Sequence, residues 1–422
     1  MADLQTRSLT VWCNQAKVGT LSEYSNLWHF EYHPQWNAFD LAPELPIESG
    51  RIEDGASQRP VQWFFDNLLP EENARALLAR DAKLDQADAF GLLTHYGAES
   101  AGALTLLHED EVPTTLGEHP LPFEELSNRI RHLPHIALSA GTSKRMSLAG
   151  AQHKLPVIYR DGTLFEPKEA TPSTHILKPE HSDPEQYPHT VINEWFMMQL
   201  AKGLGLLVPD TWVLHVPEPV YLVERFDRQS DNGVLYRRHV LDGCQLLSLD
   251  RTFKYQQCTL ASLERMVQLS RTKGRTRQRL FQWMLFNVLI GNTDDHLKNL
   301  SFFAGPSAVD LAPHYDLIST ALYEQPGKWG DARLIWAVGS ATRLGDVRLA
   351  DVLALADALK LSLSYAKRTV NYMIKQSGDV TGTLLECLEK ENLPGAGRQG
   401  ELRHLRQFQH GVLKDIVRQL ES

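Results

Sequence analysis

The order of secondary-structure signals along the chain is the strongest constraint on its fold. Residues 136–228 contain strand-like segments and one clear helix, and helical periodicity predominates from there to the end of the 422 residues. Strands with a single helix, followed by a largely helical part, predict an α+β protein with two lobes and a cleft between them. At roughly 150 residues per domain, this length allows two or three domains.

The first 120 residues predict a small β-rich module that precedes the two lobes. Residues 9–12 and 18–21 flank a turn and predict a hairpin, and residues 60–80 predict a helical region. The stretch 109–120 is acidic and rich in residues that break regular structure. We therefore expect the first domain boundary close to the end of that stretch.

Charge is distributed unevenly along a chain whose formal net charge is −9. Residues 1–125 carry 7 Lys and Arg against 21 Asp and Glu, whereas the rest of the chain carries 36 against 31. An acidic module joined to a mildly basic body indicates two units with different partners. Unevenly charged solvated surfaces explain the same numbers equally well.

The remaining composition excludes several classes of protein. With 42% hydrophobic and 23% charged residues, the chain has the composition of a globular protein. No apolar run reaches the roughly 18–20 residues of a membrane span, and the N-terminus lacks a signal-peptide pattern. Four cysteines without a Cys-x-x-Cys pair argue against a disulfide framework or a zinc knuckle. We expect a reducing, cytoplasmic location and no membrane partner.

The densest group of polar side chains is the sequence Gly-Asn-Thr-Asp-Asp-His-Leu-Lys-Asn at residues 291–299. It follows an apolar helix predicted for residues 280–290, and Asp316 lies further on between apolar neighbours. Phosphoryl transfer needs one carboxylate near the attacking hydroxyl, and an amide and a second carboxylate to hold magnesium on the phosphates. Asp294, Asn299 and Asp316 supply this set in the order that a kinase uses.

Two other interpretations of the cluster stay open. Asn292, Thr293 and Asp294 are good N-cap residues, so any one of them can serve only to satisfy backbone amides of a helical turn. A zinc site that includes His296 is less favoured, because no second histidine lies at helical spacing.

Three upstream features fit a nucleotide site, and each has a simpler explanation. Small residues at 149–151 let a backbone approach phosphate oxygens, but a plain surface turn fits as well. Lys178 ends a predicted strand, where it can pair with phosphates, oriented by Glu194, or remain solvated. Glu224 and Phe226 follow the next strand, where the chain can bind adenine or form a hinge of salt bridges.

Six ordered motifs resemble those of the HipA family of serine/threonine protein kinases, the toxins of bacterial toxin–antitoxin pairs. The similarity spans nearly the whole chain and includes the N-terminal module. The motifs are Ser-Leu-Ala-Gly-Ala-Gln-His-Lys at 147–154, Thr-His-Ile-Leu-Lys at 174–178, Asn-Glu at 193–194, Val-Glu-Arg-Phe-Asp-Arg at 223–228, Ile-Gly-Asn-Thr-Asp-Asp-His-Leu-Lys-Asn at 290–299 and Tyr-Asp-Leu-Ile-Ser at 315–319.

The resemblance implies a protein-kinase-like fold with an N-terminal module at residues 1–120, an N-lobe at 121–228 and a helical C-lobe at 229–422. It implies ATP and Mg²⁺ as cofactors, Asp294 as the catalytic base, and Asn299 and Asp316 as magnesium ligands. The residues that it implies for nucleotide binding are Ala149, Gly150, Ala151, Gln152, His153, Lys154, Lys178, Glu224, Phe226 and His296, together with Asn299 and Asp316.

The resemblance also implies regulation and partners. Ser147 matches a serine that family members autophosphorylate, which ejects the phosphate loop and switches the kinase off, as expected for a dianion beside a phosphate site. The implied substrate is an aminoacyl-tRNA synthetase, with the glutamyl enzyme favoured, whose phosphorylation arrests translation and growth. The implied partner is a HipB-like helix-turn-helix antitoxin, which represses the shared operon by binding operator DNA.

The sequence departs from the family pattern at positions outside the base and the metal ligands. His153 and Gln256 stand where the family commonly has glutamate, and Asp295 replaces a residue that is often small or acidic. These departures bear on regulation and substrate choice rather than on ATP use. Two alternatives stay open: a small-molecule kinase, and an ATP-binding co-repressor in which the basic stretch 271–279 contacts DNA phosphates.

Overall fold

The computed structural model describes residues 6–115, 117–133, 135–138, 148, 152–306, 308–325, 327–390 and 397–421. The chain divides into two compact units, each assembled from segments that are distant in sequence. Unit 1 contains Met1–Pro179, Leu214–Lys254 and Ser301–Ala312, and unit 2 contains Glu180–Val213, Tyr255–Leu300 and Pro313–Ser422. The domain boundaries expected at residues 120 and 228 stay predictions.

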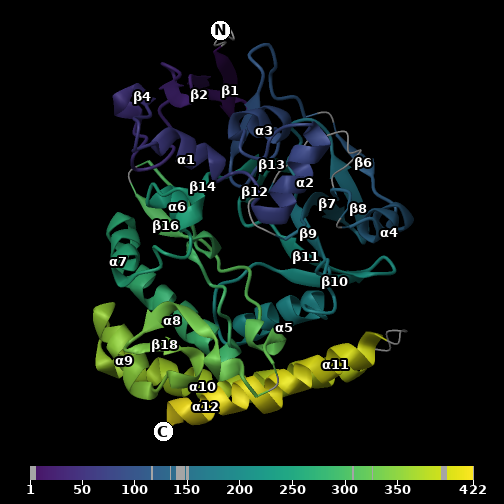
Figure 1. The fold of residues 1–422 in the computed structure, drawn as a ribbon, viewed down its shortest axis with the longest axis vertical. Helices are drawn as coiled ribbons and strands as arrows, with labels where there is room; N and C mark the ends of the chain where they lie inside the picture. Colours follow the sequence, from purple (N-terminus) through teal and green to yellow (C-terminus); the bar gives the residue numbers. More distant parts are fainter. Residues whose placement is uncertain are drawn as a thin grey trace. The chain divides into compact units, whose positions relative to one another are not determined.

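The N-terminal part of unit 1 is an antiparallel sheet with the strand order β4-β3-β2-β1-β5, drawn in purple and blue in Figure 1. The predicted hairpin is confirmed, because its two strands pair from Arg7↔Glu23 to Cys13↔Ala16. Helix α1 packs on β3, and α3 packs on β5. The strands are β1 (Arg7–Cys13), β2 (Ala16–Tyr24), β3 (Leu27–Tyr32), β4 (Arg51–Glu53) and β5 (Leu104–Leu107), with the short helix η1 (Ile47–Ser49) before β4.

The helical region expected at residues 60–80 is confirmed as helical but is broken in two. Helix α1 (Pro60–Asp66) begins on a proline, whose fixed φ and missing N–H suit a first helical position. Pro70 interrupts the chain before α2 (Glu72–Ala82), because its ring cannot continue the hydrogen-bonding pattern of a helix. Helix α3 (Ala89–Tyr96) follows.

The second sheet of unit 1 has the order β10-β11-β9-β7-β8-β6. The strands expected at 155–159, 174–178 and 220–224 are confirmed as its central strands. Their inward side chains, with Leu126 of α4, form one apolar core. The elements are β6 (Glu118–Pro120), α4 (Phe123–Arg131), β7 (Leu155–Arg160), β8 (Thr163–Pro167), β9 (His175–Pro179), β10 (Thr211–His215) and β11 (Pro219–Glu224).

Residues 228–242, which the sequence assigned to the helical part, instead form three short strands. Two of them make a hairpin around Asn232 and Gly233, whose φ angles are 50° and 80°. The third joins a small sheet of order β14-β15-β16. These elements are β12 (Arg228–Asp231), β13 (Val234–Arg237), β14 (Val240–Asp242), α6 (Gly243–Leu246), η2 (Arg251–Phe253), β15 (Ser301–Ala304) and β16 (Val309–Leu311).

Unit 2 is mostly helical, as the sequence predicts. Its α8 runs from Lys273 to Ile290, and the part from Leu280 onward is buried almost all round, which places it at the centre of the unit. The other elements are α5 (Thr190–Gly203), α7 (Leu260–Leu269), η3 (Leu297–Asn299), η4 (Thr320–Tyr323), η5 (Trp329–Asp331), β17 (Arg333–Val338), β18 (Ala341–Arg343), η6 (Leu344–Asp346), α9 (Leu349–Ala358), α10 (Leu363–Lys390), α11 (Gly397–Gln407), η7 (Phe408–Leu413) and α12 (Lys414–Glu421). Among the helices in the described residues, none has the length and apolar character that crossing a membrane requires.

Candidate active site

The buried helix α8 ends at Gly291, where the chain makes a sharp turn. Gly291 adopts a φ of 63°, a conformation that residues with a Cβ rarely take. A Cβ at this position would lie 2.7 Å from Cβ of Ala321 and 2.9 Å from Cγ1 of Val412. The glycine therefore allows the polar segment to leave the helix in a tightly packed place.

Two polar contacts hold the start of the segment in unit 2. The amide of Thr293 donates to Oγ1 of Thr320 (2.7 Å), and that hydroxyl donates to the carbonyl of Gly291 (3.1 Å). Oδ1 of Asn292 accepts the amide of Asp294 (3.0 Å). The capping interpretation therefore applies to Asn292, whose side chain shapes the turn rather than facing a substrate.

Asp294 is the exposed carboxylate of this segment. The hydroxyl of Tyr255 donates to its Oδ1 at 2.8 Å. Its backbone carbonyl accepts the amide of His296 (3.0 Å) and Nδ2 of Asn299 (2.9 Å). A rigid loop thus presents an acid to solvent, which a general base for a substrate hydroxyl requires.

The orientation of Asn299 bears on the expected magnesium ion. Because its Nδ2 donates to Asp294, its amide oxygen points away from that contact and is the atom suited to a hard cation. Among the described residues, no group of three or more His, Cys, Asp and Glu is placed to hold a metal ion. Magnesium commonly uses only one or two protein ligands beside phosphates and water, so the donors fit that ion better than zinc.

Asp316 lies in unit 2 on a segment fixed from two sides. The hydroxyl of Tyr315 donates to the carbonyl of Lys298 at 2.6 Å, next to Asn299 in the chain. On the other side, Asn193 of α5 exchanges two hydrogen bonds with the backbone of Ser319, at 3.0 and 3.1 Å. Three of the six motifs therefore converge.

Two neighbours of Asp294 are buried. Burial raises the pKa of Asp295 well above its usual value, and the nearby Asp294 carboxylate raises it further. The carbonyl of Asp295 accepts the indole N–H of Trp336 at 2.6 Å. The ring of His296 lies edge-on to Tyr255, with centroids 5.1 Å apart. Asp295 is thus a buried, packed residue, whereas Asp294 is exposed.

The candidate nucleotide residues of unit 1 lie on adjacent strands. Lys178 is buried on β9, with its Nζ 5.6 Å from the ring centre of Tyr221, its partner on β11. His153 and Lys154 are half-buried just before β7 begins, as is Gln152. Ser147, Ala149, Gly150 and Ala151 lie outside the described residues. Glu194 is buried on α5 of unit 2, and its pairing with Lys178 stays a prediction.

For the end of β11, the sequence left two interpretations open: adenine binding and a hinge of salt bridges. Arg225 and Asp227 are buried and form an ion pair, with Nη2 of Arg225 2.6 Å from Oδ2 of Asp227. Glu224 is exposed, and Phe226 is half-buried with its ring edge-on to Phe303 at 5.9 Å. Arg225 and Asp227 thus form a salt-bridge cluster, and adenine binding by Glu224 and Phe226 stays a prediction.

Sequence reasoning missed a buried glutamate that joins this salt-bridge cluster. Glu99, fully shielded from solvent, lies 3.1 Å from Arg225 and 2.8 Å from Arg228, and it also pairs with Arg237. No local signal marks Glu99, because its arginine partners lie more than 120 residues away. Only the assembled fold reveals this contact.

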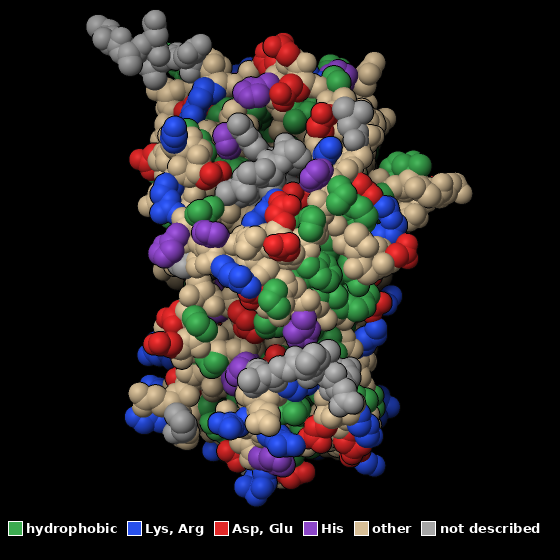
Figure 2. Space-filling view, turned by 90° about the vertical axis from the view of Figure 1, so that its right-hand side faces the viewer, with side chains coloured by type: hydrophobic (Ala, Val, Ile, Leu, Met, Phe, Trp, Pro, Cys, Tyr) green, Lys and Arg blue, Asp and Glu red, His purple; other side chains and the backbone are tan. Residues whose placement is uncertain are grey.

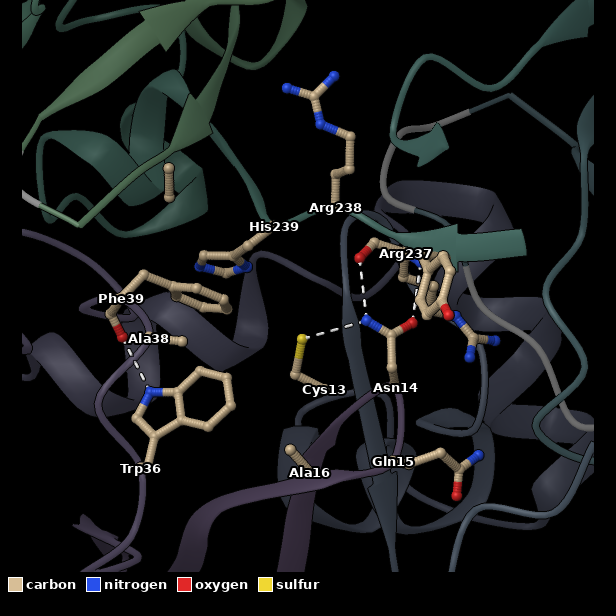
Figure 3. Close-up of a pocket in the computed structure, with 12 residues that line it drawn as sticks. Cys13, Asn14, Gln15, Ala16, Trp36, Ala38, Phe39, Arg237, Arg238 and His239 are labelled. Carbon is tan, nitrogen blue, oxygen red and sulfur yellow. Dashed lines mark hydrogen bonds between the residues drawn. The ribbon is translucent and has the colours of Figure 1, made fainter. Parts of the chain in front are cut away.

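Unit 1 also contains a cavity of about 590 Å³ that the sequence did not indicate. Figure 3 shows Trp36 and Phe39 on one side and Asn14 and Arg237 on the other, with Cys13 between them. Asn14 is fixed there by two hydrogen bonds to the backbone of Arg237. Burial raises the pKa of Cys13 to about 11, so its thiol is neutral and unreactive at pH 7.

The basic stretch 271–279 forms the first turns of α8. Arg277 lies 2.9 Å from Glu264, and burial lowers the pKa of Arg279 to about 10. Part of the stretch is therefore engaged inside unit 2. On the face of the molecule drawn in Figure 2, acidic, basic and apolar side chains intermingle.

Comparisons with known proteins match two parts of the chain to family models. The model of the HipA-like C-terminal domain matches residues 146–380, and the model of the HipA N-terminal domain matches residues 9–107. The serine/threonine-protein kinase toxin HipA of Shewanella oneidensis is 32% identical over 347 residues, covering 77% of this chain and 78% of its own. Protein Y4mE of Sinorhizobium fredii is 30% identical over 406 residues, covering 91% of this chain and 93% of its own.

A solved structure confirms the expected fold class. The HipA, HipB and operator DNA complex of Shewanella oneidensis MR-1 contains a chain that matches with a TM-score of 0.81 and 25% identity, over 97% of both chains. The two-lobed α+β fold predicted from the sequence is thereby confirmed, and so is the family resemblance of the six motifs. The chain belongs to the HipA family of serine/threonine-protein kinases.

Proposed function

We propose that this protein is the toxin of a toxin–antitoxin pair and transfers the γ-phosphoryl group of ATP to a protein hydroxyl with the help of Mg²⁺. The observation that carries the proposal is the arrangement of the polar segment of unit 2. Asp294 is exposed to solvent, and its backbone carbonyl accepts a hydrogen bond from the side-chain amide of Asn299. Tyr315, which precedes Asp316 in the chain, donates to the carbonyl of Lys298, which precedes Asn299. This set matches what phosphoryl transfer requires.

Each residue has one proposed role. Asp294 accepts the proton of the attacking hydroxyl, while Tyr255 fixes the direction of its carboxylate. Asn299 and Asp316 hold Mg²⁺, which when bound neutralises charge on the phosphates. Lys178, His296 and the loop 149–154 bind the phosphates, and Glu224 and Phe226 bind adenine.

The proposed binding partners of this chain rest on what its relatives bind. The matched structure is a complex of HipA with HipB and operator DNA, and this supports a HipB-like antitoxin for the present chain. We infer that the chain acts in the cytoplasm, where its four cysteines stay free thiols. The proposed substrate is an aminoacyl-tRNA synthetase, with the glutamyl enzyme the first to be assayed, and Ser147 is the proposed site of autophosphorylation.

One experiment separates this proposal from its alternatives. The protein is incubated with ATP and magnesium, alone and with candidate synthetases, and phosphate is located by mass spectrometry. Phosphate on Ser147 and on a synthetase, absent with Asp294→Ala, supports a protein kinase. Consumption of ATP with a metabolite mixture, and no phosphate on any protein, would instead establish a small-molecule kinase.

The co-repressor alternative rests on the exposed part of the basic stretch at the start of α8. Contacts with DNA phosphates release counterions, so operator affinity of the antitoxin complex should fall with salt more steeply than that of the antitoxin alone. Lys273→Gln and Arg275→Gln would reduce this difference in slope if the helix contacts DNA. Equal slopes for the complex and the antitoxin would exclude a direct contact.

A further inference from the structure

We propose that Glu99, in the N-terminal module, is a positioning residue for nucleotide binding: through Arg225 it fixes the segment that carries Glu224 and Phe226. The inference rests on the proposed function, because those two residues are its candidate adenine contacts. It gives the N-terminal module a part in the kinase chemistry itself, beyond any part in binding an antitoxin.

Glu99 makes an unusual number of contacts for one carboxylate. Its Oε1 accepts Nη1 of Arg225 (3.1 Å), Nη2 of Arg228 (2.8 Å) and Oγ of Ser173 (2.8 Å). Its other oxygen accepts Nη2 of Arg237. All of these side chains are buried or nearly so, so the contacts are shielded from salt and water.

The charges of the cluster are nearly balanced by two carboxylates. Asp227 is the second, and it also accepts the amide of Gly102 in the N-terminal module (2.7 Å). Arg225 in turn donates a hydrogen bond to the carbonyl of Ser100 in the module (2.9 Å). If Glu99 lost its charge, Arg237 would lose its ion pair with Glu99, and Asp227 would be the carboxylate left beside Arg225 and Arg228, so the arrangement of the three guanidinium groups depends on Glu99.

The cluster contacts the backbone just before β9 and just after β11, the two strands that carry candidate nucleotide residues. Arg225 is flanked by Glu224 and Phe226 in the chain, and its amide donates to the carbonyl of Thr174 at 2.9 Å. Ser173, held by Glu99, comes just before β9, whose Lys178 pairs with Tyr221 of β11. A shift of Arg225 therefore moves Glu224 and Phe226, because they share one stretch of backbone.

The test measures nucleotide selectivity in the full-length chain. Glu99→Gln should raise the KM for ATP by about tenfold or more, the effect expected when a buried charged partner is lost. It should also narrow the preference for ATP over GTP, while kcat stays within about threefold because Asp294 is untouched. Glu53→Gln, which removes an exposed glutamate of the same module, is the matched control and should change none of these values.

A second variant covers the case in which Glu99→Gln fails to fold. Ser173→Ala removes one hydrogen bond to Glu99 and one from Arg225 without burying an unpaired charge, and it should produce the same shift in KM and selectivity, more weakly. A lower melting temperature with KM and ATP preference unchanged would overturn the inference and leave the cluster purely structural. Failure of the unmodified chain to bind ATP would instead overturn the proposed function, and the inference with it.

Discussion

The hydroxyl of Tyr255 donates a hydrogen bond of 2.8 Å to Oδ1 of Asp294, the exposed carboxylate of the candidate active site. This contact orients the acid before any substrate arrives. Because Tyr255 begins the segment that leads to α7, it also ties the loop that carries Asp294 to a different part of unit 2.

Removing the acid should cost far more activity than removing its partner. Asp294→Asn is expected to lower the rate of phosphate transfer by ~10²–10⁴-fold, the usual contribution of a positioned general base. Tyr255→Phe should lower it by about tenfold or less, since it removes one hydrogen bond from an exposed group. Single-turnover assays check both, with melting temperatures as a control. The variant with both substitutions should transfer phosphate no more slowly than Asp294→Asn alone. A wild-type rate of transfer by Asp294→Asn would remove Asp294 from the mechanism.

Two variants of Asp316 should distinguish its role in metal binding from the strain of its backbone conformation. Its φ of 59° suits Asp and Asn better than other residues with a Cβ. Asp316→Asn should therefore keep the free energy of unfolding but weaken magnesium-dependent ATP binding, because it removes the charge. Asp316→Ala should weaken binding and lose about 1 kcal/mol of stability as well. Calorimetric titration of ATP at several magnesium concentrations, beside urea unfolding, measures the two effects; equal magnesium dependence in all three proteins would contradict the assignment.

The turn after α8 should tolerate no side chain. Gly291→Ala meets Ala321 and Val412 at less than 3 Å and requires a left-handed backbone, so we expect a loss of at least about 1 kcal/mol and lower kinase activity. The matched control is Gly378→Ala in α10, where a Cβ has open space and an αR helix favours alanine by roughly 0.5–1 kcal/mol. Urea unfolding of the two variants should give shifts of opposite sign. An unchanged free energy of unfolding for Gly291→Ala would contradict this expectation and show that the turn relaxes around the added methyl group.

His239 should make the stability of unit 1 fall in mild acid. Burial lowers its pKa to about 4, and its Nε2 donates to the carbonyl of Leu41 at 2.9 Å. The unfolded chain binds this proton below about pH 6.5 but the folded chain only below about pH 4, so stability falls as the pH drops through that window. The expected loss is about 3 kcal/mol.

Unfolding of His239→Gln at several pH values checks this expectation. Glutamine can donate to Leu41 without titrating, so this variant should lose much less stability between pH 6.5 and 4 than the wild type. His132→Gln, at an exposed ring, is the control and should follow the wild-type profile. Identical profiles for all three proteins would mean that His239 contributes nothing to the acid response.

The candidate catalytic segment could be singled out from the sequence because its polar residues lie close together in the chain. Asp294 and Asn299 lie five positions apart in one loop, and Asp316 follows after a single strand pair. The hairpin of β12 and β13 also had a local signal, the Asn232-Gly233 pair, which strongly favours a two-residue turn. The expectation of a helical chain beyond Arg228 overlooked this signal, so that part of the prediction was too coarse.

The contacts of Glu99 and the lining of the cavity beside Cys13 could not be predicted in this way. Glu99 meets its arginine partners across more than 120 residues, and nothing near it in sequence distinguishes it from the other acids of the module. The cavity is likewise lined by four separate chain segments. Such features depend on tertiary packing, which a pattern of polar and apolar residues does not specify.

The cluster around Glu99 limits how this architecture can be inherited. A recombination event that detached the module would remove Glu99, which would end its ion pair with Arg237 and leave Asp227 as the carboxylate paired with Arg225 and Arg228. A kinase domain carrying those arginines should therefore lose stability when it is transplanted without the module or a replacement acid. Recombination and engineering should therefore keep the module and the kinase domain together.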